Sequence, residues 1–360
     1  MTTYHQVLDS AGPGDATTHV ALQTRHGLRG LGRGDVFARS IEPDTDAGVG
    51  LLQDLPLGRP TDVVIYHSSL GSPEVTEAML RRPEQLVLVH HGTDPPTVIP
   101  ESDLSSAAIL PTGQSSLALL RCRVTLAITF SEVDADELVQ LGYTGVHVAA
   151  NGFRPGRLAG LPIDADTELE LGRTVGVPFV LSMSELLPDN CQHVLLQALH
   201  VLQSVHRVEL GLVLVGSAPN APYARALHDL TRSLRLQYVW FAGPQSDSSL
   251  ATIYRHTRSF CSASRQTGGF GLHPLEAMAF GVPAIVREAG STADTAGPGA
   301  LVLPYESGPL MFAEALLMVD QDDGLRSSLI DAGFHRVDEY LTASPTQSVA
   351  EIIAGAGLAS

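Results

Sequence analysis

The chain has 360 residues, and at roughly 150 residues per domain this length predicts two domains. Hydrophobic residues make up 44% of it and charged residues 17%, which is typical of a soluble globular protein and excludes a charge-rich disordered chain, a collagen and a disulfide miniprotein. No apolar run approaches the roughly 18 residues of a membrane span, and residues 1–10 lack the pattern of a secretion signal. We therefore expect a cytoplasmic protein without an integral membrane segment.

The net charge of −17 argues against nucleic acid as a partner. All 22 basic residues are arginine, which fits the GC-rich coding of some bacteria. The absence of lysine excludes a Schiff-base lysine and a P-loop lysine. The three cysteines are about 70 residues apart and predict free thiols, and no metal site is expected.

Short aliphatic runs alternate with segments of helical period along the whole chain. In the first half, residues 63–67, 86–90, 124–129 and 146–149 predict strands, and residues 73–81 and 134–141 predict helices. A polar stretch follows at residues 160–173. The alternation then restarts, with strands at 179–183, 210–215, 238–241, 259–261, 284–286 and 301–303 and helices at 193–203, 221–234, 248–256 and 274–280.

This alternation predicts an α/β fold with two doubly wound parallel sheets. We expect an N-terminal Rossmann-like domain at residues 1–172 and a second at 173–335. Residues 336–360 should form terminal helices that could pack back on the first domain. A ligand is expected in a central cleft, at the carboxyl ends of the strands.

The most informative segment is residues 268–283, Gly-Gly-Phe-Gly-Leu-His-Pro-Leu-Glu-Ala-Met-Ala-Phe-Gly-Val-Pro. A glycine-rich turn leads into a helix that Pro274 can begin, because its missing N–H would be unpaired there anyway. The free N–H groups of such a turn can bind an anion. Glu276 falls in the first turn, where its carboxylate can accept hydrogen bonds from ligand hydroxyls. The plainer alternative is a strand–turn–helix junction whose glutamate stabilises the helix dipole.

This segment resembles the donor-site signature of retaining glycosyltransferases of the two-Rossmann-domain type (GT-B), specifically family 4, whose pattern is EGFGLPxLEAMAxGxPV. Further similar passages are spread over most of the chain. They comprise the turn at 188–193, the strand at 212–216, the passage from 239 to 254, the turn at 151–153, and, as in one bacterial subgroup, residues 14–16, 65–68 and 91–95.

The resemblance implies a glycosyltransferase of carbohydrate biosynthesis that uses a nucleotide sugar as substrate, with no other cofactor and no metal, on a small acceptor. It assigns catalytic roles to Glu276 at the nucleotide ribose and to His91 at the donor sugar. It places the remaining donor-binding positions at Glu185, Asn190, Gly268, Gly269, Phe270, Gly271 and Leu272, and Arg265, just before the glycine turn, is a further candidate for donor binding. Gly14, Asp15 and His67 fall on the acceptor side. The alternatives are a packed strand-end histidine for His91 and a helix N-cap for Asp15.

Three positions depart from the family pattern. Gly268 stands where the first of two glutamates is usual, and Glu185 and Asn190 stand where an arginine and a lysine usually grip the donor diphosphate. The substitutions remove positive charge and place a repulsive carboxylate there. Arg154, Arg265 or Arg287 could compensate, because a guanidinium matches phosphate geometry; each could equally be a solvated surface residue.

These departures leave three interpretations open. The first is an active retaining glycosyltransferase. The second is a catalytically silent relative that acts as a partner of an active transferase or as a binding subunit for a sugar-like ligand. The third is a transferase of the same fold that uses an unusual donor with less phosphate charge.

Overall fold

The computed structural model of the protein describes residues 2–12, 16–41, 45, 48–68, 71–92, 110–150, 155–265, 271–343 and 347–358. The chain divides into unit 1, formed by Met1–Phe153 and Ser344–Ser360, and unit 2, formed by Arg154–Ala343. The sequence analysis places the corresponding boundaries at residues 172 and 335. In the structure, the second passage between the units falls after helix α13 (Asp323–Ala343).

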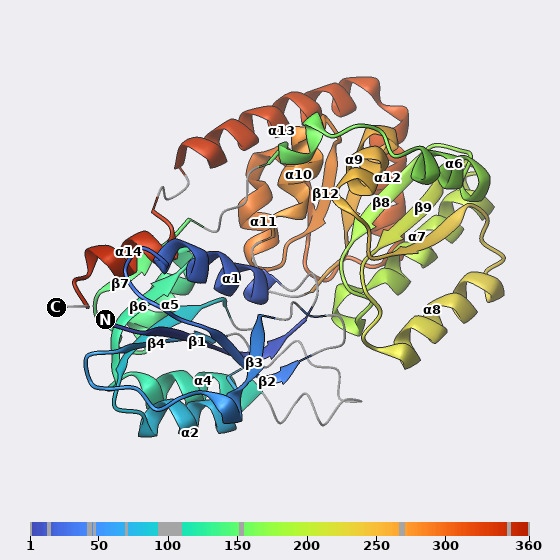
Figure 1. Ribbon diagram of the computed structural model, residues 1–360. Coiled ribbons are helices and arrows are strands. Elements are labelled where there is room, and N and C mark those ends of the chain that lie inside the picture. Colours follow the sequence, from blue (N-terminus) through green and yellow to red (C-terminus); the bar gives the residue numbers. More distant parts are fainter. Residues whose placement is uncertain are drawn as a thin grey trace. The chain divides into compact units, whose positions relative to one another are not determined.

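Unit 1 is built on a seven-stranded parallel sheet with the order β3-β2-β1-β4-β5-β6-β7 (Figure 1). Its strands are β1 (Tyr4–Ala11), β2 (Val36–Ile41), β3 (Val49–Leu51), β4 (Val63–Ser68), β5 (Gln85–His90), β6 (Val124–Thr129) and β7 (Val146–Val148). Its helices are α1 (Ala16–Leu28), α2 (Pro73–Arg81), α4 (Leu110–Leu120), α5 (Glu132–Gln140) and α14 (Val349–Gly355). The strand order reverses between β1 and β4, which is the doubly wound arrangement.

Helices cover both faces of this sheet (Figure 1). Buried residues of α2, α4 and α5 pack with strand side chains such as Val64, Leu86 and Leu88 on one face. On the other face, Ala21 of α1 packs with Leu8, and α14 lies against α1. Ser72 caps α2, Ser131 caps α5, and Ser348 forms a capping box at α14.

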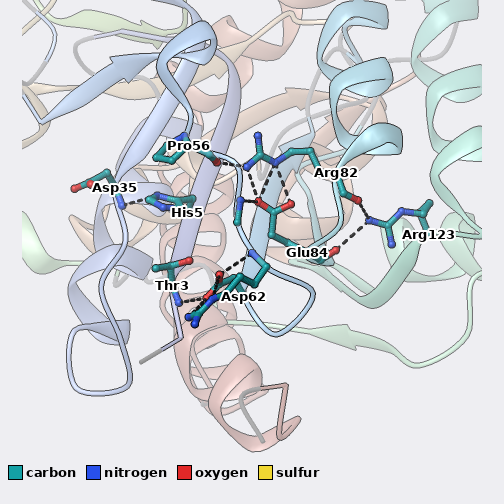
Figure 2. Close-up of polar contacts among 10 residues, drawn as sticks. Thr3, His5, Asp35, Pro56, Asp62, Arg82, Glu84 and Arg123 are labelled. Atoms are coloured by element: carbon teal, nitrogen blue, oxygen red, sulfur yellow. Dashed lines mark hydrogen bonds and ion pairs between the residues drawn. The ribbon is translucent and has the colours of Figure 1, made fainter.

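Charged side chains are paired where the strands of unit 1 begin (Figure 2). The Glu84 carboxylate accepts hydrogen bonds from the Arg82 guanidinium and from the Gly58 N–H, which is 2.7 Å away. Asp62 accepts from the N–H of Thr3 at 2.9 Å and from Arg59. The hydrogen bonds from Arg59 hold the pKa of the Asp62 carboxyl well below its usual value. These contacts join the segments before β1, β4 and β5, at the edge opposite the strands' carboxyl ends.

Unit 2 is built on a six-stranded parallel sheet with the order β10-β9-β8-β11-β12-β13. Its strands are β8 (Phe179–Met183), β9 (Gly211–Val215), β10 (Val239–Gly243), β11 (Ser259–Ser262), β12 (Ala284–Arg287) and β13 (Ala300–Leu303). Its helices are α6 (Ala165–Thr174), α7 (Gln192–Ser204), α8 (Ala221–Ser233), α9 (Asp247–His256), α10 (His273–Ala279), α11 (Gly290–Ala296), α12 (Pro309–Gln321) and α13.

The core of unit 2 lies between its sheet and helices α7, α8 and α12, with Leu199, Leu227 and Phe312 among the buried side chains. α10 packs against α13, and α6 packs against α9 (Figure 1). The order of strands reverses between β8 and β11. The segments that follow these two strands therefore flank the point where ligands bind in open α/β sheets.

The expected fold class of two Rossmann-like parallel-sheet domains is confirmed. The polar stretch at residues 160–173, to which the sequence analysis assigns no element, contains α6, and Asp164 caps this helix by accepting a hydrogen bond from the N–H of Thr167. Strands β1, β2 and β3 and helices α1, α4, α11 and α12 are absent from the prediction. No helix in the described ranges is both long and apolar enough to span a membrane.

Candidate functional site

Glu276 lies in the first turn of α10, a helix of seven residues that Pro274 helps to begin, as the sequence indicates. Leu272 is its N-cap, and the Leu272 carbonyl accepts a hydrogen bond from the N–H of Glu276 at 3.1 Å. Gly271 has a φ of +56°, a left-handed conformation that favours glycine. Gly268, Gly269 and Phe270 lie outside the described residues, as does Arg154.

The Glu276 carboxylate is buried and faces the start of unit 2. Backbone N–H groups of Gly156 and Leu158 donate hydrogen bonds to it, while its Oε1 atom has no hydrogen-bond partner in the described ranges. Burial raises the pKa of Glu276, and the two N–H groups oppose that rise. An oxygen of a held carboxylate is thus left to accept a hydrogen bond from a ligand hydroxyl.

The turn after β8 positions Glu185 and Asn190 differently. Glu185 is exposed, and its carboxylate accepts a hydrogen bond from the Ser217 hydroxyl at 2.8 Å, beyond the end of β9. Asn190 is buried: its amide N–H donates to the Glu185 carbonyl, and its amide oxygen accepts from the Ser264 hydroxyl, each at 2.9 Å. Asn190 therefore joins the end of β8 to the end of β11, the two strands at the reversal of strand order.

Two arginines stand at this same edge. The N–H of Arg265 donates to the Asp189 carbonyl at 2.8 Å, and the Arg265 guanidinium lies over the Tyr305 ring, 5.5 Å from its centroid. The guanidinium also lies 3.6 Å from the carboxylate of Glu306, which is 85% exposed. Its Nε atom is buried without a hydrogen-bond partner among the residues described.

Arg287, the last residue of β12, is only 1% exposed. It donates hydrogen bonds to the backbone carbonyls of Ala263 and Ser307, each 2.8 Å away, and to that of Tyr305. Within the described part of the chain it has no carboxylate partner, and one of its terminal nitrogens, Nη2, is unpaired. Burial and the nearby Arg265 charge lower the pKa of Arg287. The guanidinium nevertheless stays charged near neutral pH.

In unit 1, His67 and His91 are in contact. The Nδ1 atom of His67 lies 3.1 Å from Nε2 of His91, and its Nε2 atom lies 2.8 Å from the side-chain oxygen of Gln6. With that oxygen as the acceptor, His67 carries its proton on Nε2, so its Nδ1 accepts the Nε2–H of His91. The His91 ring also lies against Phe130. Gly14 and Asp15 lie outside the described residues.

Both histidines are neutral near pH 7. Burial lowers the pKa of His67 to about 3. Burial, and the neighbouring rings of His67 and His90, lower the pKa of His91 well below its usual value. His67 is completely buried, so solvent does not reach its ring. Its contact with His91 orients the His91 ring.

Polar residues inside β1 are absent from the candidates that the sequence analysis names. Gln6 contacts His67, and the buried Asp9 carboxylate accepts hydrogen bonds from the Tyr66 hydroxyl at 2.9 Å and the Gly71 N–H at 3.2 Å. Both lie on the strand next to the reversal of strand order in unit 1. The sequence carries only a weak signal for them, because Gln6 and Asp9 are two of four polar residues in the run Tyr4–Ala11.

Comparison with known proteins gives a family match over part of unit 2 and matches in fold over nearly the whole chain. Residues 169–336 match the family described as Glycosyl transferases group 1. A comparison with curated protein sequences gave no match.

Among solved structures, the chain is similar to Alr3699/HepE of Anabaena in complex with UDP-glucose, with 19% identity, 98% coverage of each chain and a TM-score of 0.71. It is also similar to sucrose-phosphate synthase of Thermosynechococcus elongatus, with 18% identity, coverage of 99% of this chain and 98% of that one, and a TM-score of 0.70. WaaG, a glycosyltransferase involved in lipopolysaccharide biosynthesis, follows with 15% identity, 98% coverage of each chain and a TM-score of 0.67. The fold is thus that of GT-B glycosyltransferases.

Proposed function

We propose that this chain is a glycosyltransferase that takes a sugar from a nucleoside diphosphate donor bound at the carboxyl edge of the unit 2 sheet. The group 1 glycosyl transferase match covers the elements that form this edge. Anabaena Alr3699/HepE, a structural neighbour, holds UDP-glucose, which makes uridine the first nucleotide to try. Retention of anomeric configuration and independence of metal come from the resemblance of residues 268–283 to family 4.

The observation that carries the proposal is the buried charge of Arg287. A buried ion without a counter-ion is unfavourable, and the carbonyls that Arg287 contacts satisfy only part of its hydrogen-bonding capacity. A diphosphate bound at this edge would supply the negative charge that the described side chains do not. Arg287 then attracts the diphosphate mainly through its electrostatic field and not through direct contact, because its guanidinium is almost inaccessible to solvent.

Arg265 is the residue placed to touch the diphosphate. Its ion pair with Glu306 is open to solvent, and such pairs contribute little to stability. A phosphate can therefore replace Glu306, and the Tyr305 ring already holds the guanidinium in place. In this way Arg265 takes over the contact that the family makes from the positions of Glu185 and Asn190. Glu185 is turned toward Ser217, so its carboxylate need not oppose the bound donor.

Glu276 binds the nucleotide ribose in this proposal. Its Oε1 atom accepts a hydrogen bond from a ribose hydroxyl, and the hydrogen bonds from the N–H groups of Gly156 and Leu158 keep the carboxylate in place. The leaving diphosphate gains negative charge as the bond to the anomeric carbon breaks, and the two arginines stabilise that charge. Gly268, Gly269, Phe270, Gly271 and Leu272 complete the donor site.

Unit 1 supplies the sugar and acceptor contacts. His91 binds the donor sugar, as the resemblance implies, and His67 fixes the tautomer and orientation of the His91 ring. Because the Nε2–H of His91 is directed to His67, the neutral His91 ring would accept a hydrogen bond from a sugar hydroxyl at Nδ1. Gly14 and Asp15 belong to the acceptor side.

The test is calorimetric titration of the purified chain with UDP, GDP and dTDP and their common sugar conjugates. We expect micromolar binding of one nucleotide. Arg265→Ala should weaken it about tenfold or more, because a charge-assisted hydrogen bond contributes ~1.5–3 kcal/mol. Glu276→Gln should also weaken it, whereas the exposed Arg225→Ala in α8 is the matched control and should leave it unchanged.

Turnover distinguishes the remaining interpretations. Sugar transfer in the presence of EDTA, with the anomeric configuration of donor and product compared by NMR, tests metal independence and retention. Binding and turnover only with a donor that carries less phosphate charge would favour the unusual-donor interpretation. Absence of binding across the whole panel would overturn the proposal and favour a silent partner subunit, to be sought by co-purification.

A further inference from the structure

Three side chains at the carboxyl end of β5 form a cluster that the proposed function does not use. They are His90, Asp134 and Glu137, and each offers one ligand atom, with all three atoms within 4.8 Å of one another. The Nε2 atom of His90 lies 4.0 Å from a carboxylate oxygen of Glu137. The cluster joins the end of β5 to α5, the helix that follows the neighbouring strand β6.

The local fold brings the two carboxylates to one side of α5. Asp134 and Glu137 are three residues apart, so they share a face of the helix. The Ser131 hydroxyl caps the helix and donates a hydrogen bond to the Asp134 carboxylate at 2.6 Å, which holds it near the first turn. Glu137 is one turn further along, with 30% of its side chain exposed, so water can reach the cluster from that side.

His90 is completely buried, yet neither of its ring nitrogens makes a hydrogen bond of good geometry in the described part of the chain. Leaving a buried polar group without a hydrogen-bond partner is unfavourable. The His90 ring is directed toward the carboxylates of Asp134 and Glu137. The backbone carbonyl of Ser68, at the end of β4, lies near the ring and favours an N–H on it. Histidine ligands commonly donate their second N–H to a carbonyl in this way.

We propose that His90, Asp134 and Glu137 bind a divalent first-row transition metal ion such as Zn²⁺. One imidazole nitrogen and two carboxylate oxygens form a donor set that suits zinc, and the nitrogen disfavours Mg²⁺ and Ca²⁺. Around a zinc ion, bonds of about 2.0–2.2 Å in tetrahedral geometry hold the ligand atoms roughly 3.3–3.6 Å apart. The three atoms lie within 4.8 Å of one another, so side-chain rotations that bring them closer by up to about 1.5 Å would form the site, and water can complete the coordination.

This site is separate from the His67–His91 contact. Side chains alternate between the two faces along a strand, so His90, the last residue of β5, lies on the same face as Leu86 and Leu88. His90 faces α5, on the side of α2 and α4, whereas His91 meets His67. The metal would tie β5 to α5 without contacting the proposed sugar-binding histidine. No sequence motif reveals this metal site, because His90 and Asp134 are far apart in the sequence.

The proposal is tested with the metal-depleted full chain, titrated with Zn²⁺ in a calorimeter and with Co²⁺ followed by visible absorption. We expect one tight equivalent whose affinity falls about 100-fold or more in Asp134→Asn and Glu137→Gln, since loss of outer-shell partners alone weakens metal sites 10–100-fold. The exposed residues of the same helix give matched controls, Asp136→Asn and Glu132→Gln, which should bind like the wild type.

Thermal unfolding provides a second measurement that does not depend on activity. Zn²⁺ should raise the melting temperature of the wild type and both controls, with no rise in Asp134→Asn or Glu137→Gln, because a ligand that binds only the folded state stabilises it. Millimolar Mg²⁺ should not displace the ion. Equal Zn²⁺ affinity and equal thermal shifts in all five proteins would overturn the proposal, since they would mean binding at other histidines.

Discussion

The Nδ1 atom of His67 lies 3.1 Å from Nε2 of His91, and both rings are buried where β4 and β5 end. Gln6 on β1 holds the opposite nitrogen of His67 at 2.8 Å. Three segments that follow one another across the sheet thus fix one tautomer of His91. Because protonation of either histidine would break this arrangement, the pair couples the geometry of the proposed sugar site to pH.

The first prediction concerns the pH dependence of stability. An unfolded histidine has a pKa near 6.5, and burial lowers the pKa of folded His67 to about 3. Below pH 6.5 the unfolded chain therefore binds a proton that the folded chain does not, so the free energy of unfolding falls as the pH falls. Each such histidine contributes a slope of up to about 1.4 kcal/mol per pH unit between its two pKa values.

Melting temperatures from pH 8 to pH 5 would measure this effect. His67→Gln should flatten the dependence, and His26→Gln, an exposed change in α1, should keep the wild-type slope. An unchanged slope in His67→Gln would mean that the histidine is protonated in the folded state or is not buried.

The second prediction concerns Glu306. Its exposed carboxylate lies 3.6 Å from the Arg265 guanidinium, so it competes with a bound phosphate. Glu306→Gln should tighten nucleotide binding by a few-fold and change the stability by less than about 0.5 kcal/mol. Calorimetry with the preferred nucleotide measures the first effect, and Glu314→Gln in α12 is a control for a general change of surface charge. Weaker binding in Glu306→Gln would contradict the role given to Arg265.

Where the strands are uniformly apolar, sequence patterns locate the elements to within about a residue. The predicted strand at 179–183 coincides with β8, and the predicted helix at 193–203 lies within α7 (Gln192–Ser204). The sequence pattern does not predict β1, because polar residues such as Gln6 and Asp9 interrupt its apolar run. These residues are buried because His67 and Tyr66, far along the chain, supply their hydrogen-bond partners. Local patterns carry no information on such partners.

The candidate site could be predicted only in part for a similar reason. The glycine turn and Glu276 are recognisable because they are contiguous in the sequence. The hydrogen bonds from Gly156 and Leu158 to Glu276, and the burial of Arg287 under the segment after β13, arise only when distant segments pack together. The sequence alone is therefore equally compatible with a solvated surface position for Arg287.

The third prediction concerns the ion pairs at the start of the unit 1 strands (Figure 2). Glu84 is buried and accepts from Arg82 and from the N–H of Gly58, so Glu84→Ala leaves a largely buried guanidinium without its partner. We expect the free energy of unfolding to fall by about 3 kcal/mol, with nucleotide affinity unchanged. Urea unfolding measures the loss. Glu77→Ala, which removes an exposed ion pair with Arg81 in α2, is the control and should change stability by less than about 0.5 kcal/mol. A similar loss in both variants would contradict a special role for the buried network.

The fourth prediction concerns the backbone contact between the ends of β8 and β9. Gly216 has a φ of +145°, and a Cβ atom added there would lie 2.1 Å from the Ser184 carbonyl oxygen and 3.1 Å from the Glu185 nitrogen. Both neighbours belong to the backbone and cannot rotate away as a flexible side chain would. Gly216→Ala must therefore displace the turn that carries Glu185 and leads to Asn190.

We expect Gly216→Ala to lower the stability of the protein by about 3 kcal/mol or more and to weaken nucleotide binding as well. Gly172→Ala is the matched control, because Gly172 lies in α6 with open space around it. Gly172→Ala should leave the nucleotide affinity unchanged and raise the free energy of unfolding by up to about 1 kcal/mol, since alanine favours the helix over the unfolded chain. If Gly216→Ala destabilised the protein but left the affinity of the surviving folded fraction intact, the turn after β8 would not contribute to the nucleotide site. In that case the contacts from Arg265 and Glu276 alone would have to account for binding.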